Sequence, residues 1–171
     1  HQPSEYRRIL RHSRSGKAPP EHLIEQARAL DDPYYRSLAL WRLSDDPRIP
    51  KEGSEALKGE SLTLVEEEQR PRRRAELIVE IARKSGPEHS PSFIRAVETV
   101  EGPKARMDAI SGICGNIRCG EMDRLLELAL ENEGRAADSA KPVIKSWVSR
   151  CETPGETPGE IIGYLEKAGP V

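Results

Sequence analysis

The sequence contains few aromatic residues and no long hydrophobic run. Seven of its 171 residues are aromatic: four Tyr, two Trp and one Phe. No segment approaches the roughly 18 consecutive apolar residues that a membrane-spanning helix requires, so we expect no membrane partner. Apolar residues still make up 36% of the chain and recur in regular patches, which argues against disorder. This length and composition predict one folded domain or a short array of small units.

Cysteine and amide side chains are also scarce. The three cysteines, Cys114, Cys119 and Cys151, are few and odd in number, and we see no apolar core of a signal peptide before them. We therefore expect reduced thiols in a cytoplasmic protein. Asn and Gln together number 5 in a chain that is 33% charged, and this composition is common in thermophile proteins.

The chain does contain an internal repeat. A proline is followed three residues later by an arginine and after seven and ten residues by aliphatic side chains. The prolines are Pro33, Pro71 and Pro103, and the arginines are Arg36, Arg74 and Arg106. The copies are offset by 38 and 32 residues, and a further step of 32 aligns Ile94 with Leu126 in a fourth copy. In that copy Arg135 replaces the proline, and the turn needs one or two inserted residues. Self-similarity of this period is typical of helical repeat proteins.

Helices are the expected elements because apolar residues recur at spacings of three and four. Proline in a first helical turn loses no hydrogen bond, and Ser54 and Ser90 are candidate N-caps. The predicted helix pairs span 21–30 and 33–45, 54–69 and 71–85, 91–101 and 103–116, and 121–132 and 136–150, with short capping helices at 4–12 and 158–168.

Each predicted pair leaves an apolar face that only a stacked neighbour can bury. The predicted fold is therefore all-α, a right-handed α-α superhelix (α-solenoid) of about four helical hairpins with short capping helices at both ends. It forms one domain over 1–171, with repeats at about 21–45, 54–85, 91–116 and 121–150.

The turn and second helix of each copy resemble those of HEAT repeats. The resemblance is carried by the pattern Asp32-Pro33…Arg36…Ala39-Leu40…Leu43 and covers about residues 21–150. It implies that the recurring arginine is structural and bonds to acidic groups in neighbouring turns, and that the second helices line a concave binding surface. The fourth copy departs from the pattern with Asp138 at the arginine position. Tetratricopeptide repeats are a close competitor, although their Trp, Gly and Tyr spacing is not found here.

No catalytic set is visible in the sequence, so we expect no enzyme activity, no cofactor and no metal. A zinc site needs four ligands, usually in two close pairs, whereas Cys114 and Cys119 have no second pair. Cys114 falls on an apolar stripe and is interpreted as a small core residue. The histidines are scattered and form no metal-binding or nucleophile-activating pattern. The carboxylate pairs at 31–32 and 45–46 flank the helix predicted at 33–45 and are interpreted as helix punctuation.

The formal net charge of −2 conceals patches of opposite charge. Residues 1–20 carry a net charge of +4, centred on a basic patch at 7–17, and residues 70–84 form a second basic patch of net +4. Glutamates within 60–68 directly precede the second patch, and residues 152–171 carry a net charge of −3. Acidic first helices beside basic second helices favour ion pairing within the repeats. Basic groups gathered on one face would instead indicate nucleic-acid binding.

The sequence supports two functional hypotheses. The leading one is a non-enzymatic scaffold that mediates protein–protein or protein–peptide interaction along its second helices, with an unidentified partner. Tyr and Arg make strong interface anchors, so the candidate binding residues are Tyr34, Tyr35, Arg42, Arg72 and Arg73. The alternative is a nucleic-acid-binding helical-repeat protein that uses the basic patches 7–17 and 70–84, with bases stacked on the neighbouring tyrosines.

Overall fold

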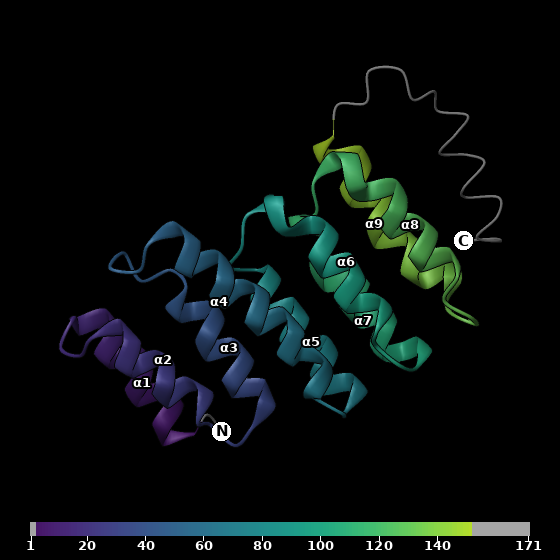
Figure 1. Ribbon diagram of the computed structural model, residues 1–171. Coiled ribbons are helices and arrows are strands. Elements are labelled where there is room, and N and C mark those ends of the chain that lie inside the picture. The colour runs from purple at the N-terminus through teal and green to yellow at the C-terminus, as the bar shows by residue number, and fades with distance from the viewer. Residues whose placement is uncertain (1–2, 152–171) are drawn as a thin grey trace. The chain divides into compact units, whose positions relative to one another are not determined.

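The structure is a computed structural model that describes residues 3–151, and every regular element in that range is helical (Figure 1). The α-helices are α1 Ser4–Ser15, α2 Pro20–Arg28, α3 Pro33–Leu43, α4 Lys51–Leu64, α5 Pro71–Ala82, α6 Ser90–Glu98, α7 Pro103–Ile113, α8 Met122–Leu130 and α9 Ala136–Arg150. Single 3₁₀ turns lie at η1 Val65–Glu67, η2 Pro87–His89, η3 Cys114–Asn116 and η4 Cys119–Glu121. The all-α prediction is confirmed. The helix predicted at 158–168 lies outside the described residues.

Each helix predicted within 3–151 is present, but some ends differ. Helix α9 has the predicted bounds, whereas α4 begins at Lys51, directly after Pro50. Ser54 therefore lies inside α4 and is not its N-cap, and its hydroxyl donates to the carbonyl oxygen of Ser44 at 2.7 Å. Ser90 is the first residue of α6, and its hydroxyl oxygen accepts the backbone N–H of Arg118 at 2.8 Å. Both serines thus join separate segments and do not cap their own helices.

The chain divides into two compact units, His1–Leu77 and Ile78–Val171, and the division falls within α5. In the first unit, α3 packs against α1, α2 and α4. Six of its eleven residues are buried, because a helix that contacts neighbours on several sides cannot keep a polar face. Ser37 and Ser61 pack face to face where α3 meets α4, and each hydroxyl donates to the other residue's carbonyl oxygen, at 2.8 and 2.7 Å. These small residues satisfy their polar groups within the core.

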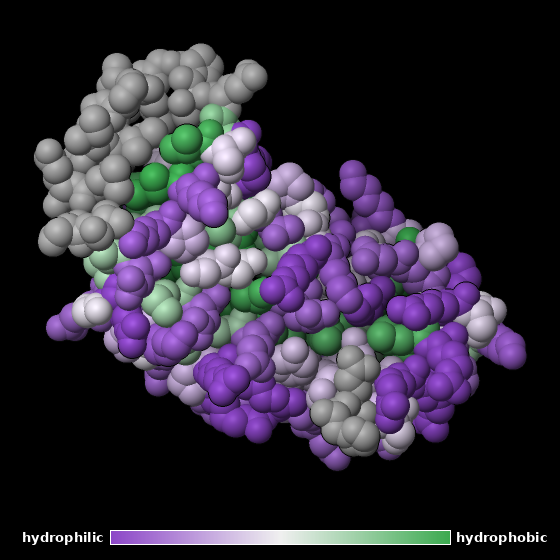
Figure 2. Space-filling model, turned by 180° about the vertical axis from the view of Figure 1, so that it is seen from behind, coloured by the Kyte–Doolittle hydropathy of each residue, from purple (hydrophilic) through white to green (hydrophobic). Residues whose placement is uncertain are grey.

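In the second unit, α8 packs on α9, α7 contacts both of these helices, and α6 contacts α7 and α8. Its fully buried side chains include Phe93, Ile94, Ile110, Ile113, Leu125 and Val143. Pro142 lies inside α9, yet the helix continues across it to Arg150. Figure 2 shows hydrophilic side chains over most of one face, as expected for a chain that is 33% charged. Within residues 3–151 no helix is long and apolar enough to cross a membrane.

The arginine of the recurring proline–arginine sequence pattern forms the same local bond at all three positions. Its Nε donates to the carbonyl oxygen six residues earlier, near the end of the preceding helical segment. The pairs are Arg36 with Leu30 at 2.8 Å, Arg74 with Glu68 at 2.8 Å, and Arg106 with Val100 at 3.1 Å. The last carbonyls of a helix lack intrahelical donors, so a guanidinium that bonds to them closes the helix end. The bond that recurs is thus to a backbone carbonyl, and Arg36 adds the expected acidic partner, Glu67, at 3.0 Å.

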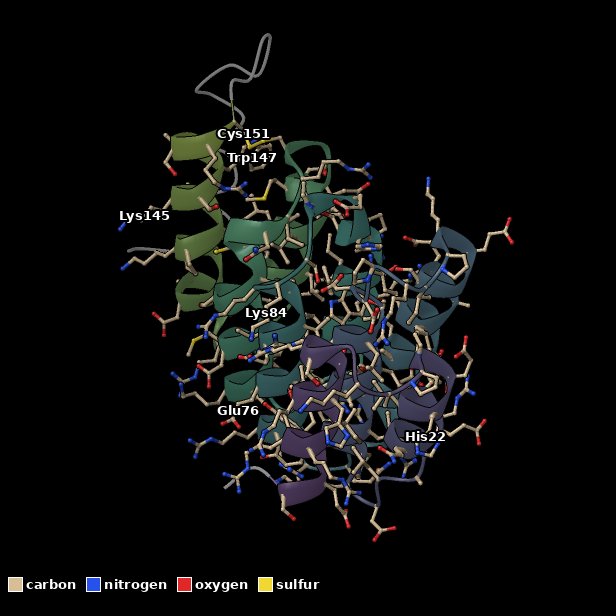
Figure 3. The ribbon with its side chains drawn as sticks, turned by 90° about the vertical axis from the view of Figure 1, so that its left-hand side faces the viewer. His22, Glu76, Lys84, Lys145, Trp147 and Cys151 are labelled. Carbon is tan, nitrogen blue, oxygen red and sulfur yellow. A yellow bond between two sulfur atoms is a disulfide. The ribbon has the colours of Figure 1, made fainter. Side chains whose placement is uncertain are left out.

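Cys119 and Cys151 form a disulfide, so the expectation of reduced thiols is wrong for this pair. Cys119 lies in η4 and Cys151 directly follows α9, and Figure 3 shows Trp147 and Cys151 near the same end of that helix. The partners are 32 residues apart, so no local motif marks the pair. Cys114 is buried, as predicted for a core residue, and burial raises the pKa of its thiol.

Candidate binding surface

Three of the five predicted binding residues lie together. The Tyr34 and Tyr35 rings meet edge to face with centroids 5.0 Å apart, and the Arg73 guanidinium lies 4.7 Å from the centroid of Tyr34. Asp32 completes the group, since its carboxylate accepts the backbone N–H of Tyr34 at 3.0 Å and caps α3. The α3 N-terminus and the first turns of α5 therefore meet through one aromatic, cationic and anionic cluster.

The charge of Arg73 is fully matched inside this cluster. Arg73 binds Asp32 in bidentate fashion at 2.7 and 3.0 Å and also reaches Glu68 at 2.9 Å. The Glu68 side chain is 2% exposed, and burial alone would raise its pKa, but the hydrogen bonds from Arg70 and the charges of Arg70 and Arg73 together lower it. The pKa of Asp32 is lowered in the same way, by Arg73 and the Tyr34 N–H against burial. This cluster joins the two helices whether or not a ligand is bound.

The arginines at the start of the second basic patch are all engaged. Arg70 pairs with Glu68 at 2.9 Å, and Arg74 donates to the carbonyl oxygens of Glu68 and Glu66 at 2.8 and 2.9 Å. Arg72 pairs with Glu76 at 3.1 Å, and its side chain is 89% exposed. The pairs of Arg70 and Arg73 with Glu68 match the ion pairing predicted between the acidic and basic segments, whereas Arg72 pairs within its own helix and Arg74 bonds to backbone carbonyls. Of the four arginines at 70–74, Arg72 and Arg70 project furthest into solvent, with side chains 89% and 65% exposed.

Arg42, the remaining predicted residue, lies elsewhere, in a groove between α1 and α3. The groove has a volume of about 610 Å³. Its lining residues are Tyr6, Arg7, Leu10, Arg11, Arg14, Ser15 and Arg42. Steps of four and three along α1 place Arg7, Arg11 and Arg14 on one side of the helix. The groove therefore combines a row of arginines with one apolar side chain, Leu10, and the rim of Tyr6.

The α1 arginines of this groove differ from those at 70–74 in their surroundings. Arg7, Arg11 and Arg14 are exposed, and none of them forms an ion pair with a residue in the part of the chain that the structure describes. Among the described residues, no carboxylate lines the groove. An anionic partner would therefore meet three α1 guanidinium groups that no carboxylate of residues 3–151 neutralises.

A second groove, of about 510 Å³, continues the first one toward the loop after α3. The two share Leu10, Arg14, Ser15 and Arg42. The second adds carboxylates, those of Asp45 and Asp46, and is lined further by Ser13, Gly16, Pro47 and Arg48. The charge of the lining thus changes along the combined groove, from purely cationic to mixed.

The two carboxylates of the second groove have different surroundings. The Asp46 side chain is 1% exposed, binds Arg48 at 2.8 Å and accepts the Ser13 hydroxyl at 3.0 Å. Hydrogen bonds from Arg48 exceed the effect of burial and lower the pKa of Asp46 from 3.8 to about 2. Asp45 is exposed and forms no ion pair within residues 3–151. Asp46 therefore belongs to the framework, and Asp45 faces solvent in the groove.

The sequence identified the α1 arginines only as part of the basic patch 7–17 and did not place them with Arg42. Their spacing of four and three residues was the available signal, since it assigns them to one helix face. The sequence did not show that Arg42 of α3 lies beside these arginines, because α3 reaches α1 only through tertiary packing.

Comparison with protein-family models, with curated proteins and with solved structures finds no match to the chain. Residues 3–151 contain no group of three or more metal-ligating side chains.

Proposed function

We propose that the chain is a non-enzymatic, helical-repeat α-solenoid that binds an acidic segment of another protein in the arginine-lined groove of α1 and α3. The observation that carries the proposal is the contrast between two sets of arginines. Those at 70–74 are engaged within their own unit, whereas Arg7, Arg11 and Arg14 line a concave surface without ion pairs among the described residues. Unneutralised charge in a groove is available to a ligand.

Arginine suits this role because its planar guanidinium binds carboxylates through two parallel hydrogen bonds. A row of three along one helix face offers such sites at successive turns, and recognition of acidic motifs by arginine clusters is a recurrent mode of peptide binding. Leu10 adds apolar contact between the charged positions. The expected partner is thus a segment in which carboxylates alternate with apolar side chains.

Nucleic-acid binding is the second candidate, favoured by the same arginines because phosphates also accept guanidinium bonds. Two observations place it second. The arginines at 70–74 are engaged by internal partners, which removes charge from the second basic patch. Tyr6, the aromatic side chain at the groove, is 1% exposed and offers no face for base stacking.

Fluorescence anisotropy with a labelled glutamate- and leucine-containing peptide tests the proposal. The peptide is expected to bind at low salt and to be released as salt rises. Arg11→Glu should weaken binding roughly tenfold, because one attraction becomes a repulsion. Arg8→Glu is the matched control, since Arg8 lies on the same helix and is exposed but does not line the groove. Equal losses in both variants, or tighter binding of a single-stranded oligonucleotide than of the peptide, would overturn the proposal.

The surface predicted from the sequence has its own test. Tyr35→Ala combined with Arg72→Ala should weaken peptide binding if the ligand also reaches the α3 N-terminus and α5. Unchanged binding in this double variant would restrict the interface to the groove. Arg73 is left in place because its removal would also leave the buried Glu68 carboxylate short of a partner.

The disulfide bears on the cytoplasmic location that the sequence led us to expect. Disulfides are rare in the cytoplasm of mesophiles but common in intracellular proteins of hyperthermophiles. A cytoplasmic location therefore fits the Cys119–Cys151 disulfide only together with the thermophile character that the low Asn and Gln content indicates. An unfolding midpoint above about 90 °C would support that combination. A midpoint in the mesophile range would favour an oxidising compartment.

A further inference from the structure

The charge of the lining changes along the combined groove, and the α1 arginines alone do not account for this change. Within residues 3–151, its first part is lined by arginines without any carboxylate, and its second part adds Asp45 and Asp46. A uniformly anionic ligand would be attracted less strongly in the second part, where two carboxylates offset the charge of the arginines in the lining. The lining therefore distinguishes between ligands by the order of their charges as well as by their net charge.

Of the two carboxylates, Asp46 is neutralised by partners within residues 3–151 and Asp45 is not. All three guanidinium nitrogens of Arg48 are engaged, with Nε and Nη2 on Asp46 and Nη1 on the carbonyl oxygen of Ala18 at 2.7 Å. The charge of Arg48 is thus matched by the Asp46 carboxylate. Asp45, one residue away from Asp46, is exposed and forms no ion pair within the described range of the chain.

The position of Asp45 is held by the backbone. Its N–H donates to the carbonyl oxygen of Arg42 at 3.3 Å in the turn that ends α3. The next residue is fixed by Arg48 and by the Ser13 hydroxyl, which tie this turn to the end of α1. The backbone at Asp45 therefore has a defined place, and Asp45 lines the groove together with Arg14 and Arg42.

We propose that Asp45 is a specificity-determining residue that pairs with a lysine or arginine of the bound segment, adjacent in sequence to the acidic residues held by Arg7, Arg11 and Arg14. The inference rests on the proposed function, because it assumes that the groove binds a peptide. It narrows the partner to segments in which an acidic stretch is flanked by a cationic side chain. Nucleic acids, which carry no cation of this kind, are disfavoured by the same residue.

Three labelled peptides of equal length test the assignment by fluorescence anisotropy. One carries the acidic stretch alone, one adds a lysine after it, and one adds the lysine before it. The full chain should bind one of the lysine peptides about two- to fivefold more tightly than the purely acidic peptide, the range for an exposed ion pair. This preference should shrink as salt is raised.

Asp45→Asn should abolish the preference for lysine while the purely acidic peptide binds as well as before or better. Glu52→Gln is the matched control, because Glu52 is exposed near the start of α4 but lines neither groove. Asp45→Lys should reverse the order and favour the purely acidic peptide.

The failures of the two proposals are distinguishable. If the purely acidic peptide binds and lysine adds nothing, or if Asp45→Asn leaves the preference intact, the role of Asp45 is overturned while the proposed function stands. If none of the three peptides binds, both proposals are overturned. Concentration-dependent self-association that is lost in Arg11→Glu would identify a second copy of the chain as the occupant and would also overturn both.

Discussion

Cys119 and Cys151 are joined by a disulfide across 32 residues. The bond links η4, directly before α8, to the residue that follows α9. Arg150 supports the same junction, because its guanidinium donates to the carbonyl oxygens of Cys114 and Ile117 at 2.7 and 2.9 Å. A covalent bond and an arginine fork thus hold the end of α9 in place.

Loss of the disulfide is expected to lower the free energy of unfolding by about 3–4 kcal/mol, because the bond closes a loop of this length in the unfolded chain. Urea titrations with and without reductant measure the difference. Cys119→Ser combined with Cys151→Ser is the control and should show no further response to reductant. Three free thiols in the unfolded, unreduced protein would contradict the disulfide.

Two glycines inside helices should respond in opposite directions to alanine. A Cβ at Gly112 in α7 would lie 2.8 Å from Cγ1 of Val79 and still nearer to its Cγ2, whereas a Cβ at Gly59 in α4 would meet nothing within 4 Å. Gly112→Ala should therefore lose about 1–3 kcal/mol through overpacking. Gly59→Ala should gain up to about 1 kcal/mol from helix propensity. Thermal or urea unfolding measures both.

The close approach at Gly112 has an internal check. Val79→Ala removes the methyl groups that a new Cβ would meet, so Gly112→Ala should cost clearly less in that background. A loss that is the same in both backgrounds would show that the approach of α7 to Val79 is not its cause.

The recurring arginine can be tested in the second unit. Arg106 donates to the carbonyl oxygens of Val100 and Glu98 at 3.1 and 3.2 Å, so Arg106→Ala leaves two groups near a helix end without these donors. We expect a loss of about 1–3 kcal/mol in the free energy of unfolding. Arg95→Ala is the control, because Arg95 is exposed and should change stability by less than about 0.5 kcal/mol. Equal effects would mean that the bond to the carbonyls is not structural.

Local patterns predicted the helices well because their causes are local. The three- and four-residue apolar spacing gave α9 its bounds, and the Asp-Pro sequence placed the α3 N-terminus, where Asp32 caps the helix. The prediction that Ser54 is an N-cap was wrong because a helix can start directly after a proline. Helix α4 begins directly after Pro50, which lies four residues before Ser54.

Pairings between distant segments were not predictable in the same way. The opposed charges at 60–68 and 70–84 indicated ion pairing but did not show which arginine would meet which carboxylate, and Arg73 reaches back to Asp32. To predict the groove, one must know that α1 lies beside α3. To predict the disulfide, one must know that η4 lies beside the end of α9. Hydrophobic periodicity assigns a residue to a helix face, but it does not name the helix that covers that face.

Acid should weaken the first unit through Asp46. Its pKa is about 2 in the folded protein against an ordinary value of 3.8, so the ionised form stabilises the fold above about pH 4. This contribution falls as the pH drops toward 2 and is absent below that value. Asp46→Asn should therefore lose about 2 kcal/mol near neutral pH, and the difference from the parent chain should vanish as the pH approaches 2.

Asp45→Asn is the matched control for this experiment, because it removes the neighbouring carboxylate, which forms no ion pair among residues 3–151. Its free energy of unfolding should stay within about 0.5 kcal/mol of the parent chain near neutral pH. Urea titrations between pH 2 and neutral pH measure all three proteins. If Asp46→Asn shows a loss that does not depend on pH, the bonds from Arg48 and Ser13 hold the loop by shape and not through the carboxylate charge, and the framework role of Asp46 beside the groove would have to be revised.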